Sequence, residues 1–199
     1  MKRSKKVGLL LMAPLTTLML TGCSEEPVDA LVFNNAEECA ASGQLSKEQC
    51  KADYEQAKKV NASVAPKYAD KNACEVDFGV GKCETAPAQA GSQSSFFMPM
   101  MMGYMMGQMF NRQGAVQQPF SANSATKTSS NFAPQPLYKS KDDSRTFRTA
   151  GNVPVTISSG LVRIRPSNLQ PKAASLTRRG GFGAQAAARQ SSSYSRTGG

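Results

Sequence analysis

Four cysteines in the first half of the chain are the residues best suited to covalent chemistry: Cys39, Cys50, Cys74 and Cys83. The chain has no histidine to complete a zinc site and no CxxC motif, so in an exported protein these thiols predict disulfides. Cys39 and Cys74 each follow a helix-capping residue, and a glycine separates each of them from the next cysteine. The two segments therefore form a degenerate repeat. This repeat favours the local pairs Cys39–Cys50 and Cys74–Cys83 over the other connectivities.

The fifth cysteine predicts a lipid anchor. It ends the sequence Leu20-Thr21-Gly22-Cys23, which is typical of the cleavage and lipidation site of bacterial lipoproteins. A basic start and an apolar run from Val7 to Leu20 precede it, and 14 residues are too few to span a bilayer. We expect Cys23 to carry acyl chains that hold the protein in the membrane of the bacterial envelope, facing the periplasm. Ser24 follows in place of an aspartate, which favours the outer membrane over the inner one.

The most apolar part of the mature chain runs from Phe96 to Phe110, with seven methionines and Gln108 as the single polar side chain. We predict an apolar helix over residues 96–112 that is too short for an ordinary membrane span. Within it, Gly103 and Gly107 form a GxxxG step that would let two helices associate closely. Burial against protein, in self-association, and insertion into the lipid interface remain alternatives.

Soft-metal chemistry is the alternative use of this segment, because thioethers favour Cu(I). The candidate ligands are the four central methionines, Met101, Met102, Met105 and Met106. The sequence contains few candidate catalytic groups, since the chain lacks histidine, a phosphate-binding loop and a serine elbow. We therefore expect no enzyme activity and no cofactor.

Charge divides the mature chain. Residues 24–95 carry seven lysines against 12 acidic residues, whereas residues 111–199 carry 13 basic residues against Asp142 and Asp143. The basic rear predicts contact with an anionic envelope surface. Its Arg178-Arg179-Gly180-Gly181-Phe182-Gly183 stretch is similar to RNA-binding RGG segments, but export would keep it away from RNA, so no nucleic-acid partner is expected.

These features predict a small α-rich, disulfide-stapled domain, one apolar Met/Gly helix and a long, mostly disordered basic tail. Ser46 caps the best helix of the domain, and Pro66 ends it. The tail is rich in proline and glutamine without apolar periodicity, apart from a possible weak hairpin at 153–165. The expected segments are a lipoprotein signal peptide (1–22), a lipidated linker (23–34), the stapled domain (35–90), the helix (96–112) and the tail (113–199).

Several motifs together resemble the YgiB family of uncharacterised enterobacterial envelope proteins. They include Phe78-Gly79-Val80-Gly81-Lys82-Cys83, Gly103-Tyr104-Met105-Met106-Gly107 and Arg179-Gly180-Gly181-Phe182-Gly183. The resemblance implies no catalytic residues. It implies one possible partner, an ATP-grasp amide ligase, because members are often encoded beside one. The function that we expect is a non-catalytic adaptor or scaffold at the membrane.

Overall fold

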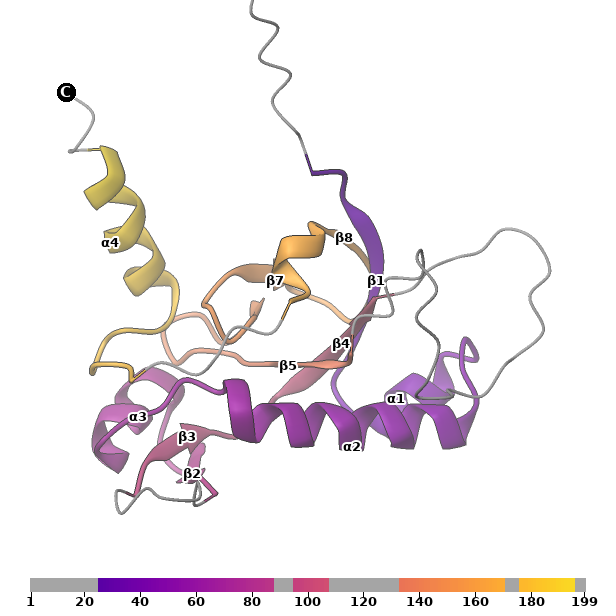
Figure 1. Cartoon of the computed structure of the whole chain (residues 1–199), viewed down its shortest axis with the longest axis horizontal. Helices are drawn as coiled ribbons and strands as arrows, with labels where there is room; N and C mark the ends of the chain where they lie inside the picture. The colour runs from indigo at the N-terminus through magenta and orange to yellow at the C-terminus, as the bar shows by residue number, and fades with distance from the viewer. Residues whose placement is uncertain (1–24, 88–94, 108–132, 171–175, 196–199) are drawn as a thin grey trace, which may run out of the picture.

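The computed structural model describes residues 25–87, 95–107, 133–170 and 176–195, which form a mixed α/β fold (Figure 1). The elements in chain order are β1 (Val28–Phe33), α1 (Ala36–Ala41), α2 (Lys47–Val64), α3 (Lys71–Phe78), β2 (Cys83–Thr85), β3 (Phe97–Pro99), β4 (Gly103–Gly107), β5 (Gln135–Leu137), β6 (Phe147–Arg148), β7 (Pro154–Thr156), β8 (Gly160–Ile164), the 3-10 turn η1 (Pro166–Asn168) and α4 (Ala184–Ser195). The α-rich class expected from the sequence is wrong. None of the helices in the described part combines the length and apolar character needed to cross a membrane.

An antiparallel sheet with the strand order β5-β4-β1-β8 organises the fold. Strand β1 is central because its Ala-Leu-Val-Phe run is apolar on both faces and is buried on both. Its Leu31 lies opposite Met106 of β4 and Leu161 of β8. Residue Tyr138, just after β5, bridges to Arg148 of β6 and so joins the β6–β7 pair to the sheet.

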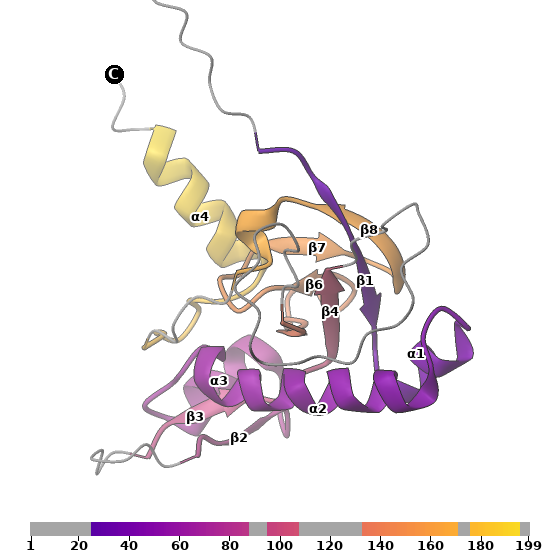
Figure 2. The same cartoon turned by 45° about the vertical axis from the view of Figure 1, so that its right-hand side comes forward.

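The strands enclose one apolar cluster, and the other side of the sheet packs against α1 and α2. Figure 2 shows α2 running across the end of the strands β1 and β4. The inner cluster takes a side chain from every strand of this arrangement, namely Ala30, Val32, Met105, Leu137, Phe147, Val155, Val162 and Ile164, with Leu169 after η1. On the opposite face, Leu31, Phe33, Tyr104 and Met106 pack against α1 and α2. Successive residues of β1 and β4 therefore enter different cores, as the alternation of a strand requires.

The methionine segment is two strands rather than a helix. Strand β3 pairs with β2, and β4 lies between β1 and β5 in the sheet. Unbranched methionine side chains fit either structure, so a continuous apolar run does not distinguish a buried strand from a buried helix. Pairing with the apolar strand β1 makes residues 103–107 a strand. Gly103 and Gly107 are thus the end residues of β4 and form no helical GxxxG seam.

The basic tail is also not mostly disordered, because its described part supplies four strands, η1 and α4. Its strands are only two to five residues long, too short to show a periodic pattern. The expected hairpin at 153–165 does contain the two strands β7 and β8. However, β7 pairs with β6 and β8 pairs with β1, so they do not form a two-stranded ladder with each other.

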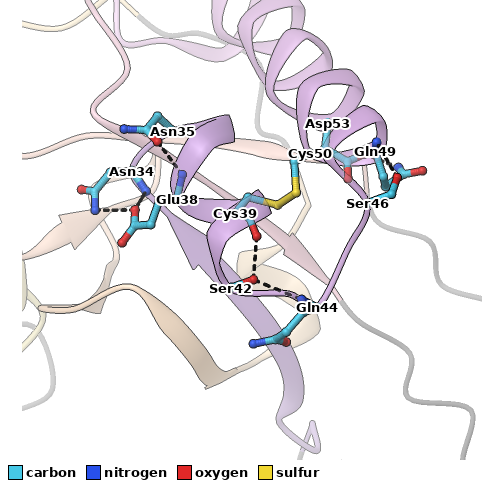
Figure 3. The surroundings of a disulfide bond; sticks show 10 residues. All are labelled: Asn34, Asn35, Glu38, Cys39, Ser42, Gln44, Ser46, Gln49, Cys50 and Asp53. Atoms are coloured by element: carbon cyan, nitrogen blue, oxygen red, sulfur yellow. Dashed lines mark hydrogen bonds between the residues drawn. A yellow bond between two sulfur atoms is a disulfide. The ribbon is translucent and has the colours of Figure 1, made fainter.

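The disulfide pairs and helix boundaries that the sequence predicts for the helical part are confirmed. The structure contains the disulfides Cys39–Cys50 and Cys74–Cys83, which are the pairs that the repeat favoured. Figure 3 shows the first bridge between α1 and the start of α2, where Ser46 accepts a hydrogen bond from the Gln49 N–H at 3.1 Å. Helix α2 then ends at Val64, before Pro66. These features depend on neighbours within about a dozen positions, which sequence patterns can capture.

Candidate functional site

Helix α3 ends in a short turn that is held in place by covalent and hydrogen bonds. The Cys74–Cys83 disulfide ties the helix to the start of β2 across nine residues. Between these cysteines, Gly79 and Gly81 have φ angles of 102° and 72°, which favour glycine. The Gly81 N–H donates to the Glu75 carboxylate at 3.1 Å, and the Lys82 N–H donates to the Gly79 carbonyl at 3.2 Å. The turn therefore presents Val80 in one defined conformation.

The buried carboxylate of Asp77 fastens the C-terminal arm, residues 176–195, beside this turn. It accepts hydrogen bonds from the Tyr68 hydroxyl at 2.8 Å, the Gly180 N–H at 2.7 Å and the Phe182 N–H at 3.1 Å. Burial, together with the hydrogen bond to Asp77, raises the pKa of the Tyr68 hydroxyl, so this group stays a donor. The Phe182 ring also packs on Phe78, with ring centroids 4.7 Å apart. The glycine-rich motif is thus a structural docking segment.

A second set of polar contacts fixes the next residues of the arm. The Asn152 side chain donates to the Gly183 carbonyl at 2.9 Å and accepts from the Gly183 N–H at 3.0 Å. Asp142 then accepts from the Ala184 and Gln185 N–H groups at 3.3 and 2.8 Å, at the beginning of α4. A carboxylate at a helix N-terminus satisfies otherwise free N–H groups and interacts favourably with the helix dipole.

Acid should weaken this attachment. Partial burial alone would raise the pKa of Asp142, but hydrogen bonds from Gln185 and Ala184, the Ser140 hydroxyl and the charge of Arg148 together outweigh it and hold the pKa below its ordinary value of 3.8. The resulting stabilisation is present above that value and is lost as the pH falls through the lower folded-state pKa. We expect exchange of the Ala184 and Gln185 amide hydrogens, corrected for intrinsic rates, to accelerate as the pH falls below about 4.

The matched variant for this prediction is Asp142→Asn, which keeps the size of the side chain and removes its charge. Protection of the two amides should be lower in the variant at neutral pH and should change less on acidification. Other carboxyls with lowered pKa, such as Asp143 and Glu38, are present in both proteins. Equal pH dependence in the two proteins would show that Asp142 does not control the arm.

The end of α3 exposes apolar side chains, and basic residues lie on the segments bonded to it. Val80 is 84% exposed, and Val76 and Met100 are partly exposed nearby on α3 and after β3. The Met100 N–H donates to the Lys82 carbonyl at 2.9 Å, which places it beside the turn. Exposed cations lie in the turn and on the segments bonded to α3. They are Lys82, Lys141, whose N–H donates to the Asp77 carbonyl at 2.7 Å, and Arg178 and Arg179, which precede Gly180. We call this set of seven residues the α3-end surface.

The acidic groups next to the α3-end surface are largely engaged elsewhere. Asp77 is buried under the arm, and Glu75 accepts from Gly81 and lies 3.8 Å from Lys71. Glu84 on β2 remains exposed. Within the described ranges, no ion pair involves the four cations of the surface. An exposed apolar residue on an ordered turn, together with basic residues on the neighbouring segments, is suited to binding a protein that has an apolar pocket and acidic groups.

The structure does not gather the candidate copper ligands into one site. Met105 and Met106 are neighbours on β4 and enter the cores on opposite faces of the sheet. Met101 packs against the helical side, with Met106. Because Met105 and Met106 enter opposite cores, the fold does not bring all four thioethers to one ion. Among the described residues, no three histidine, cysteine, aspartate or glutamate side chains cluster as metal ligands either.

The remaining predicted site residues fall into two groups. Cys23 lies outside the described residues. The four disulfide cysteines lie in the positions described above, and Gly103 contacts Phe33 and Phe147 inside the sheet. Sequence reasoning missed Asp77 and Val80. The available signal was Phe78-Gly79-Val80-Gly81, where an exposed apolar residue stands between two turn glycines.

Two comparisons with known proteins found matches to this chain. The chain is 40% identical over 119 residues to a UPF0441 protein of Erwinia tasmaniensis, an alignment that covers 54% of this chain and 53% of the relative. The chain thus matches about half the length of this curated relative. No solved structure matches the chain. The family model described as "Protein of unknown function (DUF1190)" matches residues 27–193, and the chain therefore belongs to this family.

Proposed function

We propose that this protein is a lipid-anchored, non-catalytic adaptor of the bacterial envelope that binds another envelope protein through the α3-end surface. The observation that carries the proposal is Val80, which is 84% exposed on a turn fixed by two glycines and a disulfide. Exposing an apolar side chain on a rigid turn does nothing for the packing of this chain. It does reduce the conformational entropy that this chain loses when a partner binds, because the turn is already ordered.

The sequence around Cys23 and the disulfides support the proposed location in the envelope. Cys23 closes a sequence typical of a lipidation site, and Ser24 favours the outer membrane. Disulfides such as Cys39–Cys50 persist in oxidising compartments, to which the periplasm belongs. The exposed Arg178 and Arg179 favour a partner with acidic groups over a bare anionic surface, because they precede Gly180, which Asp77 holds against the same helix that ends at the Val80 turn.

Site-specific crosslinking in living cells tests the proposal. A photoreactive amino acid at Lys82 should yield a discrete crosslinked protein, whereas the same group at the exposed Lys59 of α2 should not. Replacing Val80 by aspartate in the Lys82-labelled protein should reduce the yield about tenfold or more, because it places a charge where the partner is apolar. The measurement is the ratio of crosslinked to free protein.

Ile157→Asp is the matched control, since Ile157 is also an exposed β-branched residue and lies before β8. It should leave the crosslink unchanged. Identical products from Lys82 and Lys59, or equal effects of the two aspartate variants, would contradict a specific α3-end surface. Arg178→Glu with Arg179→Glu should also reduce the yield if the partner presents acidic groups to these arginines.

A further inference from the structure

The chain enters the fold at a fixed point. The Glu25 carboxylate accepts a hydrogen bond from the Ser167 N–H of η1 at 2.6 Å. Three residues later β1 begins, and its Val28 lies opposite Ile164, the last residue of β8. The first described residue is thus held at the end of the fold where β1 starts, β8 stops and η1 follows. We call this end, formed by residues 25–29 and 163–168, the entry end.

Only a very short stretch separates the entry end from Cys23. Glu25 is two positions after Cys23. Two residues span at most about 7 Å even when fully extended. The polar headgroup zone on one side of a bilayer is about 5–8 Å thick. Acyl chains on Cys23 would lie in the hydrocarbon core, so the fold could not move away from the headgroups.

We propose that the entry end rests on the lipid headgroups and that α1, α2 and α3 face away from the membrane. This inference builds on the proposed lipidation of Cys23. In Figures 1 and 2, β1 starts at the top of the molecule and runs down to the level of α1 and α2, and α3 with β2 and β3 also lies at the lower end. The α3-end surface is therefore turned towards the periplasm, where a partner can reach it.

Charge does not produce this orientation. The entry end exposes Arg163 and Arg165, but it also carries Glu25, Glu26 and Asp29. Asp29 lies 3.8 Å from Arg163, which offsets part of the positive charge. A surface with more acidic than basic groups is not attracted to anionic lipid. The short tether imposes the contact, which should therefore be insensitive to salt and to the proportion of anionic lipid.

Fluorescence quenching by lipid tests the orientation. The lipidated full chain is reconstituted in phosphatidylethanolamine vesicles with or without phosphatidylglycerol and with a headgroup nitroxide lipid. A fluorophore is coupled through an azide-bearing amino acid at Ser167 or, as the control, at Lys59, so that no cysteine is added. We expect strong quenching at Ser167 and little at Lys59, in both lipid compositions and at low and high salt.

A variant with about 12 Gly/Ser residues inserted between Ser24 and Glu25 isolates the tether. Such a linker has a root-mean-square length of about 20 Å, so most of the quenching at Ser167 should be lost. Equal quenching at both labels, stronger quenching at Lys59, or no effect of the insertion would overturn the inference.

Vesicle flotation and acyl labelling separate this outcome from failure of lipidation. If the native chain and Cys23→Ser both remain unlabelled and do not float, the proposed anchor is wrong and the orientation falls with it. If the native chain is labelled and floats but the quenching pattern is reversed, only the orientation is wrong.

Discussion

Replacing Gly103 by leucine should destabilise the fold by about 3 kcal/mol or more, because overpacking in a closely packed core forces the backbone to move. A Cβ atom at this position would lie 2.7 Å from the Phe147 ring and 2.8 Å from the backbone carbonyl oxygen of Phe33. The ring can shift slightly, but the carbonyl belongs to β1, the central strand of the sheet. Urea unfolding followed by far-UV circular dichroism measures the effect.

Met101→Leu is the control, since it roughly preserves volume in the same segment and should cost less than about 1.5 kcal/mol. The helix hypothesis makes a different prediction for Gly103. A helix that associates through glycine would lose self-association on substitution while each monomer stayed folded. Light scattering combined with unfolding distinguishes these outcomes. A stable Gly103→Leu monomer would contradict the close contact in the sheet.

The parts of the fold that could be predicted from sequence are those controlled by near neighbours. Asn35 accepts from the Glu38 N–H at 2.8 Å, as expected of a helix cap, and Gly43 has a φ angle of 69° where α1 stops. The cysteine pairs follow from the same spacing. Each of these signals needs only a few residues and a defined backbone angle, so tertiary context does not change its meaning.

The methionine segment shows why structure that depends on distant residues cannot be predicted from local sequence patterns. Met105 and Met106 enter different cores, yet a helix would also bury both in an associating bundle. The choice depends on β1, which pairs with β4 although residues 34–102 separate the two strands. The rear half was misjudged for a related reason, since its residues bury their apolar side chains among strands formed by the front half.

The candidate site was only partly predictable for the same reason. Asp77 stands on the short helix α3, where an acidic residue is usually solvated. Its donors Gly180 and Phe182 lie 103 and 105 positions further along the chain. The glycine-rich motif is similar in sequence to RGG segments, and that similarity predicts no contact inside a fold. Its hydrogen bonds to Asp77 form only in the folded chain, where the arm packs against α3.

Replacing Asp77 by alanine should release the arm and destabilise the protein by about 3–5 kcal/mol, because several buried donors would lose their acceptor at once. The Tyr68 hydroxyl and the Gly180 and Phe182 N–H groups all depend on this carboxylate, which is 4% exposed. Trypsin offers a direct measurement. Cleavage after Arg178 and Arg179 requires the arm to leave its docked conformation, so the variant should be cut much faster under native conditions.

Two variants decide whether the carboxylate acts through the arm. Asp70→Ala removes the cap of α3 and should cost about 1 kcal/mol without exposing the arginines. Asp77→Asn preserves the shape and leaves one acceptor oxygen, so its cleavage rate should fall between those of the native chain and Asp77→Ala. If Asp70→Ala and Asp77→Ala accelerate cleavage equally, general weakening of α3 explains the effect. If only the Asp77 variants do so, the two hydrogen bonds from Gly180 and Phe182 hold the arm, and the position of Arg178 and Arg179 depends on this one buried side chain.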